Sequence, residues 1–373
     1  MGTMVRAFLA VVLLGACAQV PQRELHAYRD AFSQANQAAQ EVLLDYDAAS
    51  QEHARRMAET PPAQPEAGAP GPAGGAGAGG DARAKPKPAP TRLYPERFVP
   101  ASTTQPNGSD VEQRLRALAV IDRYNTLLAD LAEGKSASEA AASARGLISA
   151  LQAAFGVVPG LDAFVDTLAS AAAQARARQQ FVVAVKEGEK PVTSILDDVL
   201  KKDAASFYQL RRALAEIDQN DIVERWLAHS DALRAVVASH AFSADPEPLN
   251  DAQARLDASS SKAGSLINNG QPIVLKPGPG GAKAADDAAE AAINEHLLAI
   301  ERETAALLDI AARMKAYHQL LERYVQLLDG TKSAMVNLRV AVDRPQDVMM
   351  QFEDLTRTAL ALRRDFIKVR ANF

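Results

Sequence analysis

Apolar residues recur at alternating steps of three and four along residues 23–59, a stretch without glycine or proline. Such steps place side chains on one stripe of a helix and, when sustained over about four heptads, predict a coiled-coil-like helix. At 1.5 Å per residue this helix would extend for about 55 Å. The residues on the stripe are Leu25, Tyr28, Phe32, Ala35, Ala39, Val42, Tyr46, Ala49 and His53.

The hydrophobic pattern disappears over residues 60–109. Eleven of the 20 prolines of the chain lie here, around the run GPAGGAGAGG. A segment of this composition cannot bury enough apolar surface to offset the entropy lost on ordering, so it is predicted to be a linker, about 40 Å long on average.

Helical periodicity resumes at residue 110. A first helix is expected over 110–133, and a capping box at Ser136 and Glu139 predicts a second helix up to Phe155. A third is expected over 161–187, with Gly188 at its end and Pro191 in the first turn of the next helix. Residues 192–244 predict one very long helix, or two helices joined at DQND over 218–221.

Residues 245–283 form an irregular insertion, with a short helix expected over 249–262 and an extended piece at Ile273–Leu275. A helix is predicted over 284–342, with Gly330 as a candidate kink. Pro345 ends this helix, and a last helix follows. The last seven residues also alternate as a strand would, but they continue the helical stripe of Leu355, Ala359, Leu362, Phe366, Val369 and Phe373.

These elements predict an all-α fold, an elongated multi-helix bundle with long coiled-coil-like helices. We expect an N-terminal helix within 17–59, the linker 60–109, and a bundle domain over 110–373 that contains the insertion 245–283.

The most apolar stretch, residues 147–173, surrounds the turn GVVPG. It predicts either two buried helices that meet at a tight turn or a membrane-active helical hairpin, although each arm is too short to span a bilayer. The residues that cluster around the turn are Leu151, Phe155, Leu161, Phe164, Val165 and Leu168.

The composition argues against one class of partner and indicates which side chains form the core. The chain carries 41 Lys+Arg against 46 Asp+Glu, a net charge of −5, which argues against a nucleic-acid partner. Only 5% of residues are aromatic while 47% are hydrophobic, so the core is expected to be built from small side chains.

Two pairs of residues have the spacing of known chemical sites. Ser259 and Lys262 have the spacing of a serine–lysine nucleophile, but the companion motifs of penicillin-binding enzymes are missing from the sequence. His318 and Glu322 lie one helical turn apart, without the further ligands of a zinc or di-iron motif. The sequence therefore predicts no catalytic residues, no metal and no cofactor.

The beginning of the chain has the features of an export signal. Arg6 is followed by an apolar run over 7–14, then by Gly15, Ala16 and Cys17, the only cysteine. The apolar run has about eight residues, whereas a membrane-spanning helix needs about 20. The sequence LGAC at 14–17 resembles the lipobox of bacterial lipoproteins.

This resemblance implies that residues 1–16 are a signal peptide cleaved between Ala16 and Cys17, and that Cys17 carries the lipid. Several acyl chains, at about 0.8 kcal/mol per buried methylene, would anchor the protein firmly. Ala18 and Gln19 follow, without aspartate, and lipoprotein sorting rules then imply the periplasmic side of the outer membrane.

We therefore expect a lipid-anchored, non-enzymatic protein that acts as a structural or interaction scaffold in the periplasm. Its expected partners are the membrane, through the anchor, and an envelope protein or peptidoglycan; the oligomeric state stays open. The alternative is a membrane-active protein, similar to pore-forming toxins, that uses the hairpin 147–173.

Overall fold

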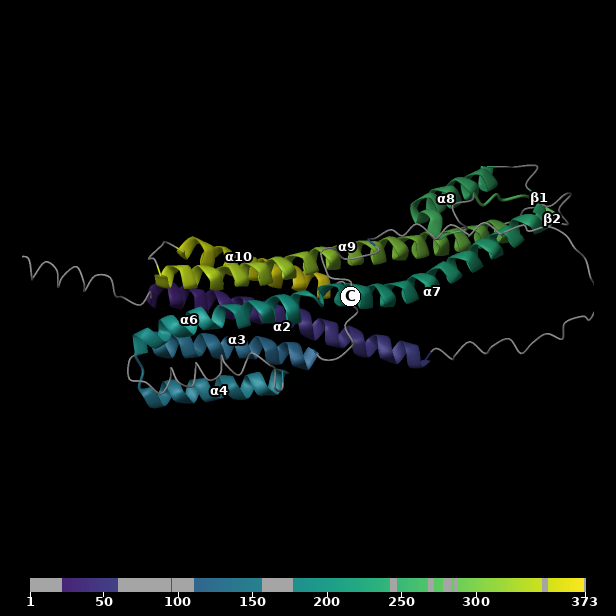
Figure 1. The fold of residues 1–373 in the computed structure, drawn as a ribbon. Helices are drawn as coiled ribbons and strands as arrows, with labels where there is room; N and C mark the ends of the chain where they lie inside the picture. Colours follow the sequence, from purple (N-terminus) through teal and green to yellow (C-terminus); the bar gives the residue numbers. More distant parts are fainter. Residues whose placement is uncertain are drawn as a thin grey trace, which may run out of the picture. The chain divides into compact units, whose positions relative to one another are not determined.

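The structure is a computed structural model that describes residues 22–59, 95, 111–155, 177–241, 247–267, 272–277, 283–284, 287–343 and 348–371. These residues form an all-α fold of packed helices, as the periodicity predicts (Figure 1). In chain order the elements are α2 (Gln22–Glu59), α3 (Val111–Ala132), α4 (Ala137–Phe155), α6 (Ala177–Ser194), a π-helix (Ile195–Lys201), α7 (Ala204–Ser239), β1 (His240–Ala241), α8 (Glu247–Ala263), a 3₁₀-helix (Gly264–Leu266), β2 (Lys283–Ala284), α9 (Asp287–Asp343) and α10 (Met349–Arg370).

The chain divides into two compact units. Unit 1 comprises Met1–Ala48, Arg97–Gln209 and Tyr317–Phe373, and unit 2 comprises Ala49–Glu96 and Leu210–Ala316. Sequence patterns divide the chain into consecutive segments, whereas each unit draws on segments that are far apart along the chain. The helices α2, α7 and α9 each contribute residues to both units.

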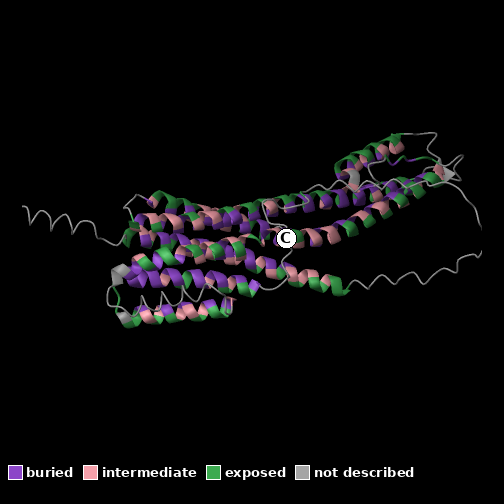
Figure 2. Ribbon diagram, in the orientation of Figure 1, coloured by how far each residue is buried: buried purple, intermediate pink, exposed green. Residues whose placement is uncertain are grey.

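Helix α2 supplies a buried stripe to the core, and Figure 2 shows such stripes of buried residues along the helices. Every predicted stripe residue from Leu25 to Ala49 is buried, and His53 at the end of the stripe is half-buried, which confirms the heptad pattern. In unit 1 the ring of Tyr28 packs edge-on against Phe352 of α10, with ring centroids 5.8 Å apart. The small residues between the aromatic ones allow α2 to lie close to its neighbours.

Helix α6 of unit 1 differs from the sequence prediction at Gly188. This glycine does not end a helix; α6 continues to Ser194. A Cβ atom at position 188 would lie 2.3 Å from the ring of Tyr124 in α3, so glycine is required here by close packing. The hydroxyl of Tyr124 donates a hydrogen bond to the Ala184 carbonyl one turn earlier, at 2.9 Å, which holds the ring over the glycine.

Pro191 also lies inside α6, not in the first turn of a new helix. Proline has no N–H group, so the hydrogen bond to the carbonyl four residues earlier is missing. The wider π-helix begins at Ile195, within the next turn, and residues 202–203 then separate it from α7. The predicted helix over 192–244 is thus broken near residue 202, whereas α7 passes through Asp218–Asp221 without interruption.

Unit 2 is built from the end of α2, most of α7, α8 and the first half of α9. Its largest buried side chain is Trp226, whose indole N–H donates to the Thr304 hydroxyl at 3.0 Å. The Gln253 side chain of α8 donates to the Ile273 carbonyl and accepts from the Leu275 N–H, each at 2.8 Å.

The predicted short helix of the insertion is confirmed as α8, and the segment expected as an extended piece, Ile273–Leu275, lies in a described stretch without helix. Residues 273–275 form no strand; β2 lies at Lys283–Ala284 and pairs in parallel with β1. Because the Gln253 amide already bonds the backbone of residues 273 and 275, it occupies groups that a strand partner would use. At the end of the chain, α10 is helical to Arg370, in agreement with the helical stripe.

Candidate functional site

The most deeply buried charge in the described part of unit 1 is the guanidinium of Arg114 on α3. Its Nε donates to Oδ2 of Asp203 at 2.6 Å, and the two side chains are 4% and 17% exposed. Asp203 lies in the break before α7, and its backbone carbonyl accepts the N–H groups of Ser206 and Phe207 at 2.9 and 3.2 Å. The first turn of α7 therefore fixes the carboxylate that Arg114 needs.

Aromatic rings enclose the same guanidinium. Its central carbon lies 5.5 Å from the ring centroid of Tyr46 and 5.4 Å from that of Phe207, within the range of a cation–π interaction. The ring centroids of Tyr46 and Phe207 are 4.4 Å apart, and the ring centroid of Tyr324 on α9 lies 6.1 Å from that of Phe207. We call Arg114, Asp203, Tyr46, Phe207 and Tyr324 the Arg114 cluster.

Burial dominates the electrostatics of the Arg114 cluster. It raises the pKa of the Tyr324 hydroxyl well above its ordinary value, although the nearby Arg114 charge acts in the opposite direction. Among the described residues, neither this hydroxyl nor Nη1 of Arg114 has a hydrogen-bond partner. A charge so enclosed cannot reach a substrate in solvent, so the arrangement serves to hold α2, α3, α7 and α9 in register.

Ion pairs also join α9 to the segment around the π-helix in unit 1. Lys201 Nζ lies 2.6 Å from Oδ1 of Asp329, and Lys332 Nζ lies 2.5 Å from Oδ2 of Asp197, so each helix supplies one cation and one anion. The four side chains are between about a quarter and half exposed. Partly exposed pairs of this kind contribute little to stability, about 0–1 kcal/mol each, but they select one register between the two helices.

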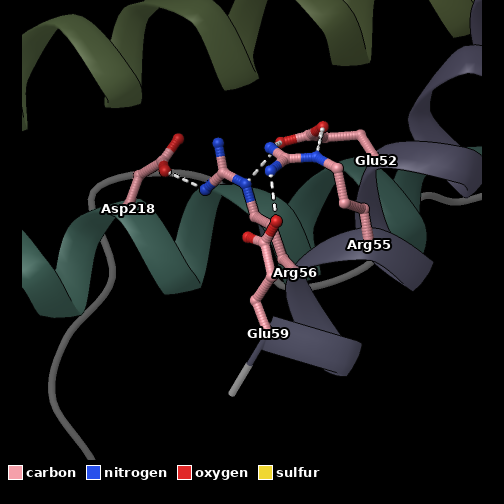
Figure 3. Close-up of polar contacts among 5 residues, drawn as sticks. All are labelled: Glu52, Arg55, Arg56, Glu59 and Asp218. Carbon is pink, nitrogen blue, oxygen red and sulfur yellow. Dashed lines mark hydrogen bonds and ion pairs between the residues drawn. The ribbon is translucent and has the colours of Figure 1, made fainter.

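A second charged cluster lies at the end of α2, in unit 2 (Figure 3). Arg55 donates to Glu52 and to Glu59, each at 2.7 Å, while Arg56 donates to Glu52 at 2.6 Å and reaches Asp218 on α7. The two arginines lower the pKa of Glu52 to about 2 through these hydrogen bonds. The cluster is open to solvent and links the last turns of α2 to α7.

The predicted lipidation site and most of the predicted hairpin lie outside the described residues. This applies to Ala16 and Cys17, and to the hairpin residues Leu161, Phe164, Val165 and Leu168. The other two hairpin residues lie on α4, where Leu151 is buried and Phe155 is half-buried. The first arm of the hairpin thus turns at least one of its apolar side chains into the core beside α3.

Neither of the two residue pairs with the spacing of a chemical site forms such a site among the described residues. On α8, Ser259 is buried and Lys262 is exposed, so the hydroxyl and the amine face different surroundings. On α9, Nδ1 of His318 lies 3.6 Å from Glu322, and the His318 ring packs edge-on against Tyr208. Among the described residues no three histidine, cysteine or acidic side chains gather as metal ligands.

The sequence analysis missed the Arg114 cluster. On α3 the charged Arg114 is buried, whereas the neighbouring apolar Leu115 is only half-buried. A signal was nevertheless present, because Arg114 lies three residues after Val111 and four before Leu118, both of which are buried. A charge at such a position indicates a buried partner elsewhere in the fold.

None of the described helices is both long enough and apolar enough to cross a membrane. Comparison of the chain with models of protein families, with curated proteins and with solved structures finds no match.

Proposed function

We propose that the chain is a lipid-anchored, non-enzymatic protein of the bacterial envelope that acts as a structural or protein-interaction scaffold in the periplasm. The observation that carries the proposal is the position of the only cysteine, directly after a basic and apolar segment and the small residues Gly15 and Ala16. In this proposal Cys17 receives the lipid, and the anchor holds the protein at the periplasmic side of the outer membrane.

The all-α fold supports a scaffold. α9 alone contains 57 residues. Buried aromatic residues and the Arg114 cluster hold the helices of unit 1 in register, and the outer faces of the helices carry charged side chains. A helical surface of this kind suits a partner that binds along a face, and the proposed partners are an envelope protein or peptidoglycan.

The experiment compares Cys17→Ser with the wild type in a bacterial host supplied with a labelled fatty acid. We expect the wild type to incorporate the label and to sediment with membranes, and the variant to do neither, because only the Cys17 thiol can accept the diacylglycerol. Gln19→Ala, which leaves the lipobox intact, serves as the matched control and should behave as the wild type. Labelling of Cys17→Ser, or an unlabelled wild type, would refute the proposal.

Partners are then sought with the lipidated chain in intact cells. Photo-crosslinking from exposed positions on α9 should yield a discrete adduct with an envelope protein, or attachment to peptidoglycan that lysozyme releases. An enzymatic role would instead appear as turnover of envelope material that purified protein catalyses and that heat abolishes.

A further inference from the structure

The beginning of α2 is fixed at one end of unit 1. The side chain of Gln22, the first residue of α2, donates to the Ala132 carbonyl at the end of α3, at 3.1 Å. One turn later, Nε2 of His26 lies 3.9 Å from Glu133. These contacts place the start of α2 beside the turn between α3 and α4, so the first turn of α2 is part of the folded unit.

Helix α10 begins at the same end. Tyr28 of α2 packs against Phe352, and farther along both helices Glu41 accepts a hydrogen bond from Arg363 at 3.0 Å. The two helices therefore run parallel, and their first residues share one end of unit 1 (Figure 1). Met350, in the first turn of α10, is 72% exposed, more than any other large hydrophobic side chain in the described part of the chain.

The chain length between anchor and fold limits where the membrane can lie. Cys17 precedes Gln22 by five residues, which span at most about 18 Å when fully extended. We propose that the end of unit 1 formed by Gln22, Arg23, Gly134, Lys135 and Met350, called here the Gln22 end, rests on the bilayer surface. The inference depends on the proposed lipidation of Cys17 and adds a defined orientation to it.

The side chains of the Gln22 end suit a lipid surface. Met350 offers an apolar, flexible thioether that can enter the boundary between headgroups and acyl chains. Arg23, in the first turn of α2, is exposed and can approach lipid phosphates.

A different orientation would lay α10 flat on the membrane. Its second half exposes Leu360, Arg364, Ile367 and Lys368, a basic and apolar face. In that orientation Ile367 would lie at the membrane, so the test below compares positions 350 and 367.

The test uses the fact that lipidation consumes the only native thiol. Met350→Cys and, separately, Ile367→Cys each provide one free thiol for an environment-sensitive fluorophore; the second residue is 65% exposed on the same helix and is the matched control. The lipidated full-length proteins are reconstituted into vesicles of phosphatidylethanolamine and phosphatidylglycerol. Quenching by aqueous iodide is compared with that of the same variants carrying Cys17→Ser, free in solution.

We expect reconstitution to reduce iodide quenching at position 350 several-fold and to leave position 367 unchanged. Equal quenching at both positions, or protection at position 367, would overturn the orientation while the measured fatty-acid label upheld lipidation. Absence of the label in the wild type would instead refute the proposed function, and the orientation with it.

Discussion

Replacing Arg114 by methionine tests whether the buried ion pair holds unit 1 together. Methionine has a similar length and flexibility, so it fills the space between Tyr46 and Phe207 and leaves little cavity. What it removes is the charge that pairs with Asp203. The carboxylate then stays in a largely enclosed place without its partner.

The structure sets the expected magnitude. Removal of one member of a buried pair costs about 3–5 kcal/mol of unfolding free energy, because the remaining charge is uncompensated. Asp203 is 17% exposed, so water can solvate it in part, and we expect a loss near 3 kcal/mol, the lower limit of that range. Arg116→Met is the matched control, since Arg116 lies on the same helix, is 47% exposed and pairs with Glu112. Its expected cost is about 0.5 kcal/mol.

The measurement is denaturant unfolding of the Cys17→Ser protein, followed by circular dichroism and by the fluorescence of Trp226. Trp226 belongs to unit 2, so a difference between the two signals would show whether the units unfold separately. The double variant Arg114→Met with Asp203→Asn removes both charges. It should cost less than the sum of the two single variants, by about 1–3 kcal/mol.

Two results would contradict this reasoning. If Arg114→Met and Arg116→Met cost the same small amount, the Arg114 guanidinium is not buried as described. If the double variant equals the sum of the single ones, Arg114 and Asp203 do not interact, and the aromatic rings alone account for the effect.

Gly188→Ala should lower stability by about 1–3 kcal/mol despite the better helix propensity of alanine, because its Cβ would overlap a tyrosine ring. Gly146→Ala, whose Cβ would meet only Arg123 Nη1 at 4.0 Å, should stabilise by up to about 1 kcal/mol; thermal melting compares the two variants, and equal shifts would contradict the packing. Glu52 should titrate near pH 2 by carboxyl NMR, so its stabilising effect is complete above pH 4.5 and is lost as the pH falls through about 2. Arg55→Gln should raise the pKa of Glu52, and a titration midpoint that this variant leaves unshifted would disprove the pairing. Leu151→Asp should lower the free energy of unfolding by several kcal/mol, because it buries an unpaired charge, and the unlipidated wild type should release no dye from liposomes. Normal melting of Leu151→Asp together with dye leakage by the wild type would favour a membrane-active hairpin.

The sequence by itself determined the fold class and most of the described helices. Helical periodicity depends on residues three and four apart, so it can be recognised in a short segment of sequence. The stripe from Leu25 to Ala49 is buried as this periodicity predicts. The resemblance to a lipobox also rests on a few consecutive residues, and it remains the basis of the proposed localisation and lipid anchor.

Tertiary structure decided what happens where helices meet. Gly188 looks like a helix end until Tyr124, 64 positions earlier in the chain, is packed against it. Arg114 looks like a surface charge until the start of α7 brings Asp203 to it, 89 positions later. Residues so far apart become neighbours only through the packing of whole helices, and heptad spacing specifies that a stripe is buried without specifying which helix buries it.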